Sequence, residues 1–237
     1  MSSEPRTFSR EVAGKRIEIE TGLLAQAATA SCTIRIGDTI LLVTLADGVP
    51  RPGIDFFPLT VDFEERMYAI GKIPGSFFRR EGRPGTDATL AARMTDRPIR
   101  PLFPKGYRRE IHLVCTLLSA DRENPAEALA TTGASTVLGI SNIPFEGPVS
   151  SVRIGRVDGE LILFPTYQEL AESDFDLTVA GTDASVVMLE AGANEVSEDT
   201  LIEAIDFGMT AVGELNALQA EIAEALGVPK TPFEAPA

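Results

Sequence analysis

The sequence of 237 residues contains no tryptophan, one histidine and two cysteines, and these shortages exclude several kinds of site. The single histidine, His112, lies in an apolar, strand-like run and is better explained as a packed or edge residue than as a general base. Cys32 and Cys115 also lie in apolar runs, so we expect buried thiols in a reducing compartment. A disulfide and a zinc site are not expected.

Long apolar runs are also missing. No apolar stretch of the sequence is long enough to span a bilayer. The start, MSSEPRTFSREVAG, resembles neither a secretory signal nor an arginine-rich transit peptide. P-loop and dinucleotide-binding patterns are absent, and Ser135 lies in a helical pattern without a nucleophile elbow. We therefore expect a cytoplasmic protein with no membrane role and no serine nucleophile.

Positive charge is scarce overall but is concentrated in one segment. The formal charge is −14, which taken alone opposes a polyanionic partner such as RNA. Residues 79–109, the basic segment, nevertheless contain nine lysines or arginines against three acids, whereas the chain from Asp158 onward contains 17 acids and one base, Lys230. Any contact with RNA should therefore be confined to the basic segment.

Short β-branched and apolar runs predict most of the secondary structure. Pairs of such runs predict hairpins at 7–20, 31–46, 149–166 and 173–192, and single strands are expected at 56–65 and 111–120. Residues 71–85 contain four glycines and two prolines, which predicts a long exposed loop. Strands interrupted by few helices favour an α+β fold over a doubly wound sheet.

Three helices are expected from their capping and breaking residues. The first, at 86–96, should end before Pro98, because proline has no amide to donate and disfavours helical geometry in the preceding residue. The second should begin with Asn124 as its N-cap and Glu127 completing a capping box, and should run to residue 140. The third, capped by Ser197, has apolar residues every three or four positions and should end near Gly227.

The strongest candidate for binding combines the basic segment with the two aromatic residues that precede it. Arginine can engage phosphate oxygens through paired hydrogen bonds, and exposed aromatic rings can stack on bases without sequence preference. This combination indicates single-stranded nucleic acid, and the candidate residues are Phe77, Phe78, Arg79, Arg80, Arg93, Arg97 and Arg100. The alternative is that the rings fill a core while the arginines pair with acids on a solvated face, namely Asp87, Asp96 and Glu110.

Two carboxylates form a weaker candidate, for a metal site. In an extended SDFDLT segment, Asp174 and Asp176 project to the same face as Thr178, so they could bind Mg²⁺. Two ligands without a third make a poor cage, and an acidic solvent face explains the same pattern. The pattern favours the solvated face.

A long stretch of the sequence resembles one protein family. Residues 56–104, FFPLTVDFEERMYAIGKIPGSFFRREGRPGTDATLAARMTDRPIRPLFP, resemble the first RNase PH domain of bacterial polyribonucleotide phosphorylases. The similarity extends from about Gly14 to Glu198 through LSADRENPAEALATTGAS and DFDLTVAGT. It implies an α+β, RNase PH-like domain of mixed and antiparallel sheets with packed helices at 1–197, then a long helix and the start of a helical linker at 198–237.

The resemblance also implies an activity. Members of this family degrade RNA by reversible 3′→5′ phosphorolysis, in which inorganic phosphate releases nucleoside diphosphates and Mg²⁺ assists the developing charge. They carry a second RNase PH domain, which holds most of the active site, and they form ring-shaped homotrimers. The implied partners are single-stranded RNA, inorganic phosphate, the second domain and further copies of the chain, and Mg²⁺ is expected in the second domain rather than here.

By the same resemblance, this chain has lost the catalytic residues. It keeps Asp176, but Thr178 stands in place of a lysine, Leu170 in place of an aspartate, and SADRENP in place of phosphate-binding serines. We expect no catalytic residue in this domain. The resemblance assigns the segment Phe77–Arg80 to a constriction through which RNA passes, and it assigns contacts with RNA or phosphate across the interdomain interface to Arg93, Arg97 and Arg100.

Two other hypotheses fit parts of the same pattern. A non-catalytic RNA-guiding and assembly module that merely shares the fold would also lack the catalytic residues. A small-molecule enzyme on a similar scaffold would leave the Phe77–Arg80 loop unexplained.

Overall fold

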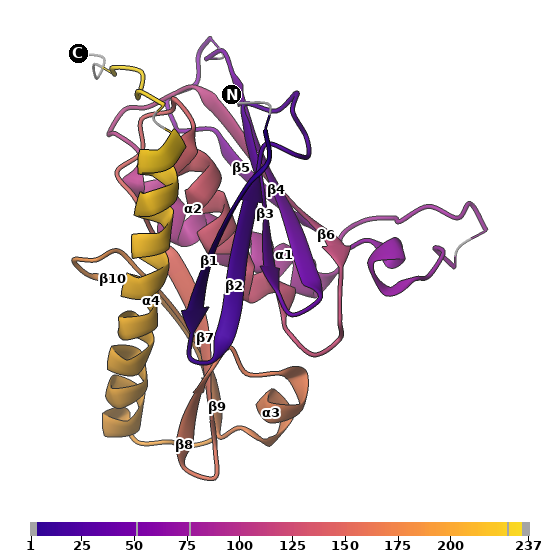
Figure 1. The fold of residues 1–237 in the computed structure, drawn as a ribbon, viewed down its shortest axis with the longest axis vertical. Coiled ribbons are helices and arrows are strands. Elements are labelled where there is room, and N and C mark those ends of the chain that lie inside the picture. Colours follow the sequence, from indigo (N-terminus) through magenta and orange to yellow (C-terminus); the bar gives the residue numbers. More distant parts are fainter. Residues whose placement is uncertain (1–3, 51, 76, 227, 234–237) are drawn as a thin grey trace.

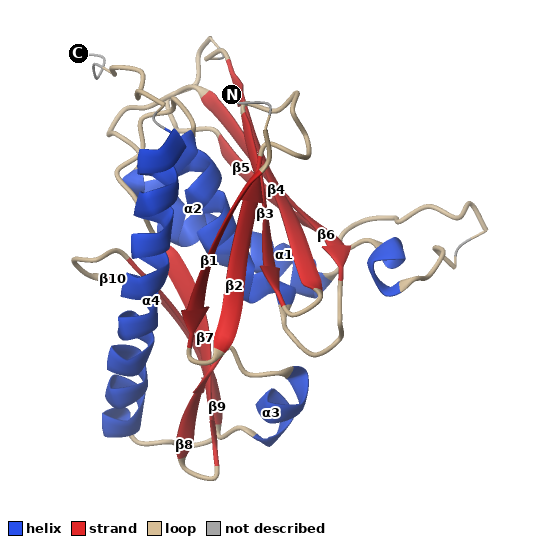
Figure 2. Ribbon diagram, in the orientation of Figure 1, coloured by secondary structure: helices blue, strands red, loops and turns tan. Residues whose placement is uncertain are grey.

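The computed structural model describes residues 4–50, 52–75, 77–226 and 228–233. A six-stranded sheet has the order β1-β2-β3-β4-β6-β5, and a four-stranded sheet has the order β10-β9-β7-β8. Neighbouring strands are antiparallel except β5 and β6, which are parallel. The predicted α+β fold of mixed and antiparallel sheets is confirmed (Figure 2).

All the predicted strands are present in the two sheets. The six-stranded sheet consists of β1 (Arg6–Val12), β2 (Lys15–Thr21), β3 (Ala30–Ile36), β4 (Thr39–Gly48), β5 (Leu59–Glu64) and β6 (Glu110–Ser119). The four-stranded sheet consists of β7 (Ser150–Val157), β8 (Glu160–Leu163), β9 (Phe175–Gly181) and β10 (Val186–Ala193). The four predicted hairpins pair as expected, because each turn brings two alternating runs into antiparallel register.

The helices pack between and beside the two sheets. The α-helices are α1 (Thr86–Ile99), α2 (Ala130–Ile140), α3 (Tyr167–Glu172) and α4 (Glu198–Leu226), and the short 3₁₀ helices are η1 (Met67–Ile70), η2 (Arg100–Leu102) and η3 (Ala126–Leu129). Helix α2 contacts both sheets, and α4 runs along them from β7 and β9 to β1 (Figure 1). Across the described ranges, no helix is both long and apolar enough to cross a membrane.

Small residues let α2 and α4 approach the sheets closely. A Cβ atom at Gly133 of α2 would lie 2.8 Å from Val43 Cγ2, and one at Gly208 of α4 would lie 2.5 Å from Ile154 Cδ1. Both distances are shorter than a van der Waals contact, so a larger residue at either position would require the facing side chain or the helix to shift. The close approach buries α2 almost completely and joins the sheets through one core.

The predicted end of the first helix is wrong. Helix α1 continues through Pro98 to Ile99, and the Arg100 amide still donates to the Asp96 carbonyl before the chain enters η2. Pro98 and Ile99 are both buried, and Ile99 is completely inaccessible. Burial of this last turn outweighs the single hydrogen bond that proline removes near a helix end.

The predicted capping box at Asn124 and Glu127 is also wrong. Pro125 precedes η3, no side chain caps that turn, and α2 starts only at Ala130. The side-chain amide of Asn124 donates to the Asp121 carboxylate instead, while Glu127 pairs with Arg153. The third helix agrees better, since the Thr200 amide donates to Ser197 Oγ and α4 ends at Leu226; Gly227 lies outside the described residues.

Candidate nucleic-acid interface

The loop between η1 and α1 projects from the body of the molecule (Figure 2). It carries two exposed aromatic rings, those of Phe77 and Phe78. Phe77 is 94% exposed and Phe78 is 76% exposed, so the predicted exposure is confirmed. Their rings pack edge to face with centroids 5.4 Å apart. Each ring therefore supports the other while the remaining faces are open to a stacking partner.

Charged groups of this loop differ in what they contact. Arg79 and Arg80 are exposed, and neither has an ion-pair or hydrogen-bond partner in the part of the chain that the structure describes. Arg79 adopts a left-handed backbone conformation, with φ of 50°. Glu81 anchors the loop instead, because its carboxylate accepts the Met67 amide at 3.1 and 3.2 Å. The two guanidinium groups are thus available to a phosphate.

Helix α1 holds two of the remaining arginines of the candidate site, Arg93 and Arg97. Arg93 is exposed beside a groove of about 320 Å³ between α1 and β5, and it has no partner among the described residues. Arg97, one turn later, is about half exposed and its Nη1 lies 2.9 Å from Glu190 Oε2 of β10. Both guanidinium groups face solvent. The Arg97 guanidinium must leave Glu190 before all of its donors can bind a phosphate.

Arg100 is occupied by the fold. Its guanidinium donates to both carboxylate oxygens of Asp96 and to the carbonyls of Phe57 and Leu59, at 2.7–3.1 Å. It also lies 5.7 Å from the centre of the Phe57 ring. These contacts fasten the end of α1 to the start of β5, so Arg100 has fewer donors for a ligand than Arg93. Of the acids considered as partners on a solvated face, Asp96 is thus paired.

The two candidate metal ligands are each held by an arginine. Asp176 accepts two hydrogen bonds from Arg153, at 2.7 and 2.6 Å, and Asp174 accepts from Arg156 at 2.7 Å. Within the described ranges, no three acidic, histidine or cysteine side chains are grouped so as to hold a metal ion. The residues present do not fit Mg²⁺. Sequence reasoning missed both arginines, because their contacts depend on how β7 pairs with β9. That pairing sets Arg153 opposite Thr178, two residues along β9 from Asp176.

The turn at 119–125 carries its own anion. Asp121 accepts hydrogen bonds from the amides of Glu123 and Asn124, both at 2.8 Å, from the Asn124 side chain at 2.7 Å and from the Thr39 hydroxyl at 2.9 Å. Burial opposes ionisation, but these donors outweigh it and hold the pKa of Asp121 far below its usual range. The backbone donors of this turn are therefore already taken by a carboxylate.

The residues that might act as nucleophile or base are also accounted for. Cys32 and Cys115 are buried and form no disulfide, and burial raises the pKa of the Cys115 thiol to about 12. His112 is half exposed rather than packed, and its Nε2 lies 2.7 Å from Asp62 Oδ2 on β5. A thiolate nucleophile is therefore unsupported.

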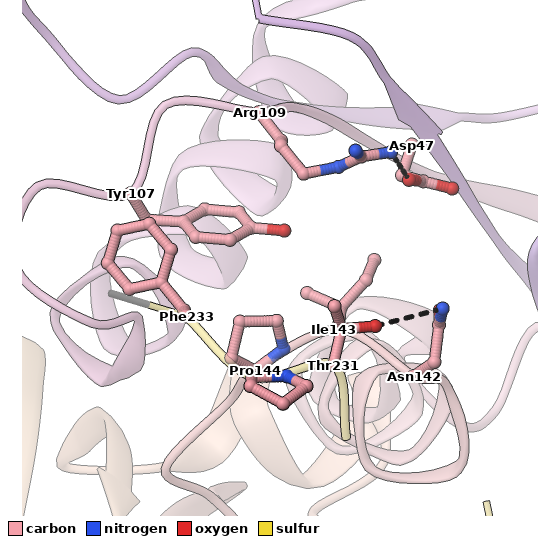
Figure 3. A pocket seen from close by; sticks show the side chains of 9 residues that line it. Asp47, Tyr107, Arg109, Asn142, Ile143, Pro144, Thr231 and Phe233 are labelled. Carbon is pink, nitrogen blue, oxygen red and sulfur yellow. Dashed lines mark hydrogen bonds and ion pairs between the residues drawn. The ribbon is translucent and has the colours of Figure 1, made fainter. Parts of the chain in front are cut away.

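A small cavity of about 140 Å³ lies between the C-terminal residues Thr231 and Phe233 and the end of the basic segment, Tyr107 and Arg109 (Figure 3). Phe233 packs edge-on against Tyr107, and the Thr231 amide donates to the Asn142 carbonyl at 2.7 Å. Arg109, the one cation among the described residues that line the cavity, is paired with Asp47. The described lining therefore offers a ligand no unpaired charge.

Comparisons with known proteins agree with this architecture. The family model described as "3' exoribonuclease family, domain 1" matches residues 13–144, and "3' exoribonuclease family, domain 2" matches residues 147–211. The crystal structure of rice (Oryza sativa) Rrp46 superposes with a TM-score of 0.68, covering 93% of this chain and 94% of that one. Its 13% identity supports a shared fold alone.

Closer relatives are polyribonucleotide nucleotidyltransferases. That of Heliobacterium modesticaldum is 52% identical over 226 residues, 95% of this chain and 32% of the relative. That of Thermomicrobium roseum is 51% identical over 230 residues, 96% of this chain and 29% of the relative. The chain thus spans about a third of the length of the curated relatives it matches. It belongs to the 3′ exoribonuclease family and matches the N-terminal portion of polyribonucleotide nucleotidyltransferases.

Proposed function

We propose that this chain is the N-terminal part of a phosphate-dependent 3′→5′ exoribonuclease that releases nucleoside diphosphates from RNA, and that this domain guides RNA rather than cleaving it. The observation that carries the proposal is the projecting loop, with two exposed rings beside two guanidinium groups that have no partner among the described residues. The relatives are polyribonucleotide nucleotidyltransferases, which supports the activity proposed for the whole protein.

In this proposal the loop and α1 perform two tasks. Phe77 and Phe78 stack on successive bases, which needs no base-specific hydrogen bond and therefore suits an enzyme that degrades any sequence. Arg79, Arg80 and Arg93 bind phosphates, and Arg97 joins them when it exchanges Glu190 for a phosphate. Arg100 contributes mainly by fixing the end of α1 against β5.

The chemistry itself is assigned to the second RNase PH domain of the parent protein. Here Asp174 and Asp176 are committed to arginines, and Asp121 fills the donors of the turn that stands where the resemblance places phosphate-binding serines. Mg²⁺ and inorganic phosphate would be bound in that second domain, with three copies forming a homotrimer. A cytoplasmic location, which the unpaired cysteines favour, belongs to the same proposal.

A second candidate, a non-catalytic RNA-binding and assembly module, is favoured by the same committed carboxylates. The two differ in the whole protein, which would release nucleoside diphosphates from poly(A) only under the first proposal. The 237-residue chain alone, incubated with poly(A), phosphate and Mg²⁺, should bind the RNA but should release no nucleoside diphosphate. Release of nucleoside diphosphate by this chain alone would overturn the assignment of a guiding role. If the whole protein releases no nucleoside diphosphate either, the assembly module is favoured.

A further inference from the structure

A second, acidic cleft lies between α1 and the four-stranded sheet. Its volume is about 600 Å³, and its carboxylates come from Glu65, Asp87, Glu127, Asp176 and Glu190. Arg153 is the only cation among the described residues that line it. A cleft of this charge is unsuited to RNA or phosphate, and the proposed guiding role involves only one of its residues, Glu190, as the partner of Arg97.

The floor of the cleft presents an unused hydroxyl. In the antiparallel register, Thr178 of β9 lies between Arg153 of β7 and Glu190 of β10. Thr178 is only 8% exposed, lines the cleft and has no hydrogen-bond partner among the described residues. Its side-chain oxygen is not among the fully buried, unpartnered polar atoms of the described residues, so the hydroxyl opens onto the cleft, where a ligand can donate or accept a hydrogen bond.

The negative charge of the cleft is not balanced by its own residues. Arg153 pairs with Asp176 and Glu127, but Glu65 and Asp87 have no cationic partner in the described part of the chain. Burial and the neighbouring carboxylates, Asp87 and then Glu127, raise the pKa of Glu65. A bound cation would relieve this repulsion.

The walls between the carboxylates restrict the kind of cation. Hydrocarbon surface separates the charges and comes from Phe63, Leu90, Ala91, Met94, Ala128 and Ala191. No group of three ligands suitable for a metal ion exists in the described ranges. Separated carboxylates joined by apolar walls match a flexible ligand whose ammonium groups are spaced by methylene chains, because such stems bury on hydrocarbon while their charged ends pair.

We propose that this cleft binds a linear aliphatic polyamine. One ammonium group pairs with Glu65 and Asp87, the methylene chain lies along Leu90 and Met94, and a second ammonium group reaches the Thr178 hydroxyl and Glu190. Because Glu190 also holds Arg97, a polyamine that engages it would leave Arg97 unpaired. Binding of the polyamine itself does not require the proposed RNA function, so it is tested without RNA.

The test is calorimetric titration of the whole 237-residue chain with spermidine at constant ionic strength. Wild type should bind one equivalent at the cleft, and the double variant Glu65→Gln, Asp87→Asn should bind about fivefold more weakly or worse. Thr178→Val should also weaken binding. Glu203→Gln, which removes an exposed charge of α4 outside the cleft, is the matched control and should bind as wild type does.

Three outcomes would overturn the proposal. Equal losses in the cleft variant and in Glu203→Gln would mean that spermidine is a diffuse counterion of an acidic protein. Displacement of spermidine by equimolar MgCl₂ would indicate a divalent cation instead. Cleft-dependent binding of a hexa-arginine peptide without binding of spermidine would identify the cleft as a docking site for a basic protein segment. Thermal melts of each variant establish that a loss of binding is not a loss of fold.

Discussion

The loop at 71–85 and the turn at 119–125 differ in whether their polar groups have partners within the chain. In the loop, Arg79 and Arg80 have no partner among the described residues and two rings are open to solvent. In the turn, the Asp121 carboxylate accepts the backbone and side-chain donors that could otherwise hold an anion. The comparison teaches that binding capacity depends on which donors the fold itself consumes, and not on the number of charges in a segment.

Removing the internal anion should have the largest effect on folding. Asp121→Ala leaves several donors of the turn without an acceptor, and since the residue is partly exposed we expect a loss of about 2 kcal/mol in the free energy of unfolding. Chemical denaturation at pH 7 measures it, with Glu203→Ala as the control for a surface carboxylate. A loss of the same small size in both variants would contradict the role given to Asp121.

The Asp121 effect should also depend on pH. The pKa of this carboxyl is lower in the folded state than in the unfolded chain, so its contribution to stability is present above the unfolded pKa, about 3.9. It decreases as pH falls below that value toward the folded pKa. The difference in stability between wild type and Asp121→Ala should therefore be full at pH 7 and smaller at pH 3. A pH-independent difference would show that packing, rather than charge, is lost.

Arg93 of α1 and Arg100 of η2, just past the end of α1, offer a smaller contrast. Arg100→Ala removes four hydrogen bonds that join α1, Asp96 and the start of β5, so we expect about 1–2 kcal/mol of lost stability. Arg93→Ala touches no partner among the described residues and should change stability by less than about 0.5 kcal/mol. Equal effects on unfolding would show that Arg100 is not held as described.

Arg93, whose replacement should hardly affect stability, should matter more for RNA binding than Arg100. Arg93→Ala and Arg97→Ala should each weaken binding of single-stranded RNA to a similar degree for every sequence, because phosphate contacts position a strand without specifying bases. The slope of log affinity against log salt should fall by about 0.7–1 for each lost contact. Titrations at several salt concentrations with the full-length protein measure this. An unchanged slope would make these arginines ordinary surface charges.

The sequence was a good guide to the strands because burial on one or both faces gives a clear alternating pattern. It failed where distant contacts decide the local structure. Burial of Ile99 keeps α1 helical through Pro98, and Arg153 draws Glu127 away from a helix cap. Helix α3 was missed although its Thr166–Glu169 capping box was readable, because its six residues show no apolar periodicity.

The candidate site could be predicted only where local composition is sufficient. Glycines and prolines around Phe77 and Phe78 predict an exposed loop whatever the rest of the chain does. The partners of Asp174 and Asp176 depend on the β7–β9 register, and the commitment of Arg100 depends on where β5 begins. Neither follows from spacing along the sequence. The roles assigned to the arginines in RNA binding remain predictions.

The claim that the projecting loop is open to a partner is tested most directly by replacing both of its rings. In Phe77→Ala, Phe78→Ala, the melting temperature should hardly change, because both rings are exposed. The affinity of the full-length protein for single-stranded RNA should fall by about one to several kcal/mol, since stacking contributes roughly 1–3 kcal/mol per base. A large drop in melting temperature with unaltered RNA affinity, as for buried rings whose loss costs about 3–5 kcal/mol, would contradict the account.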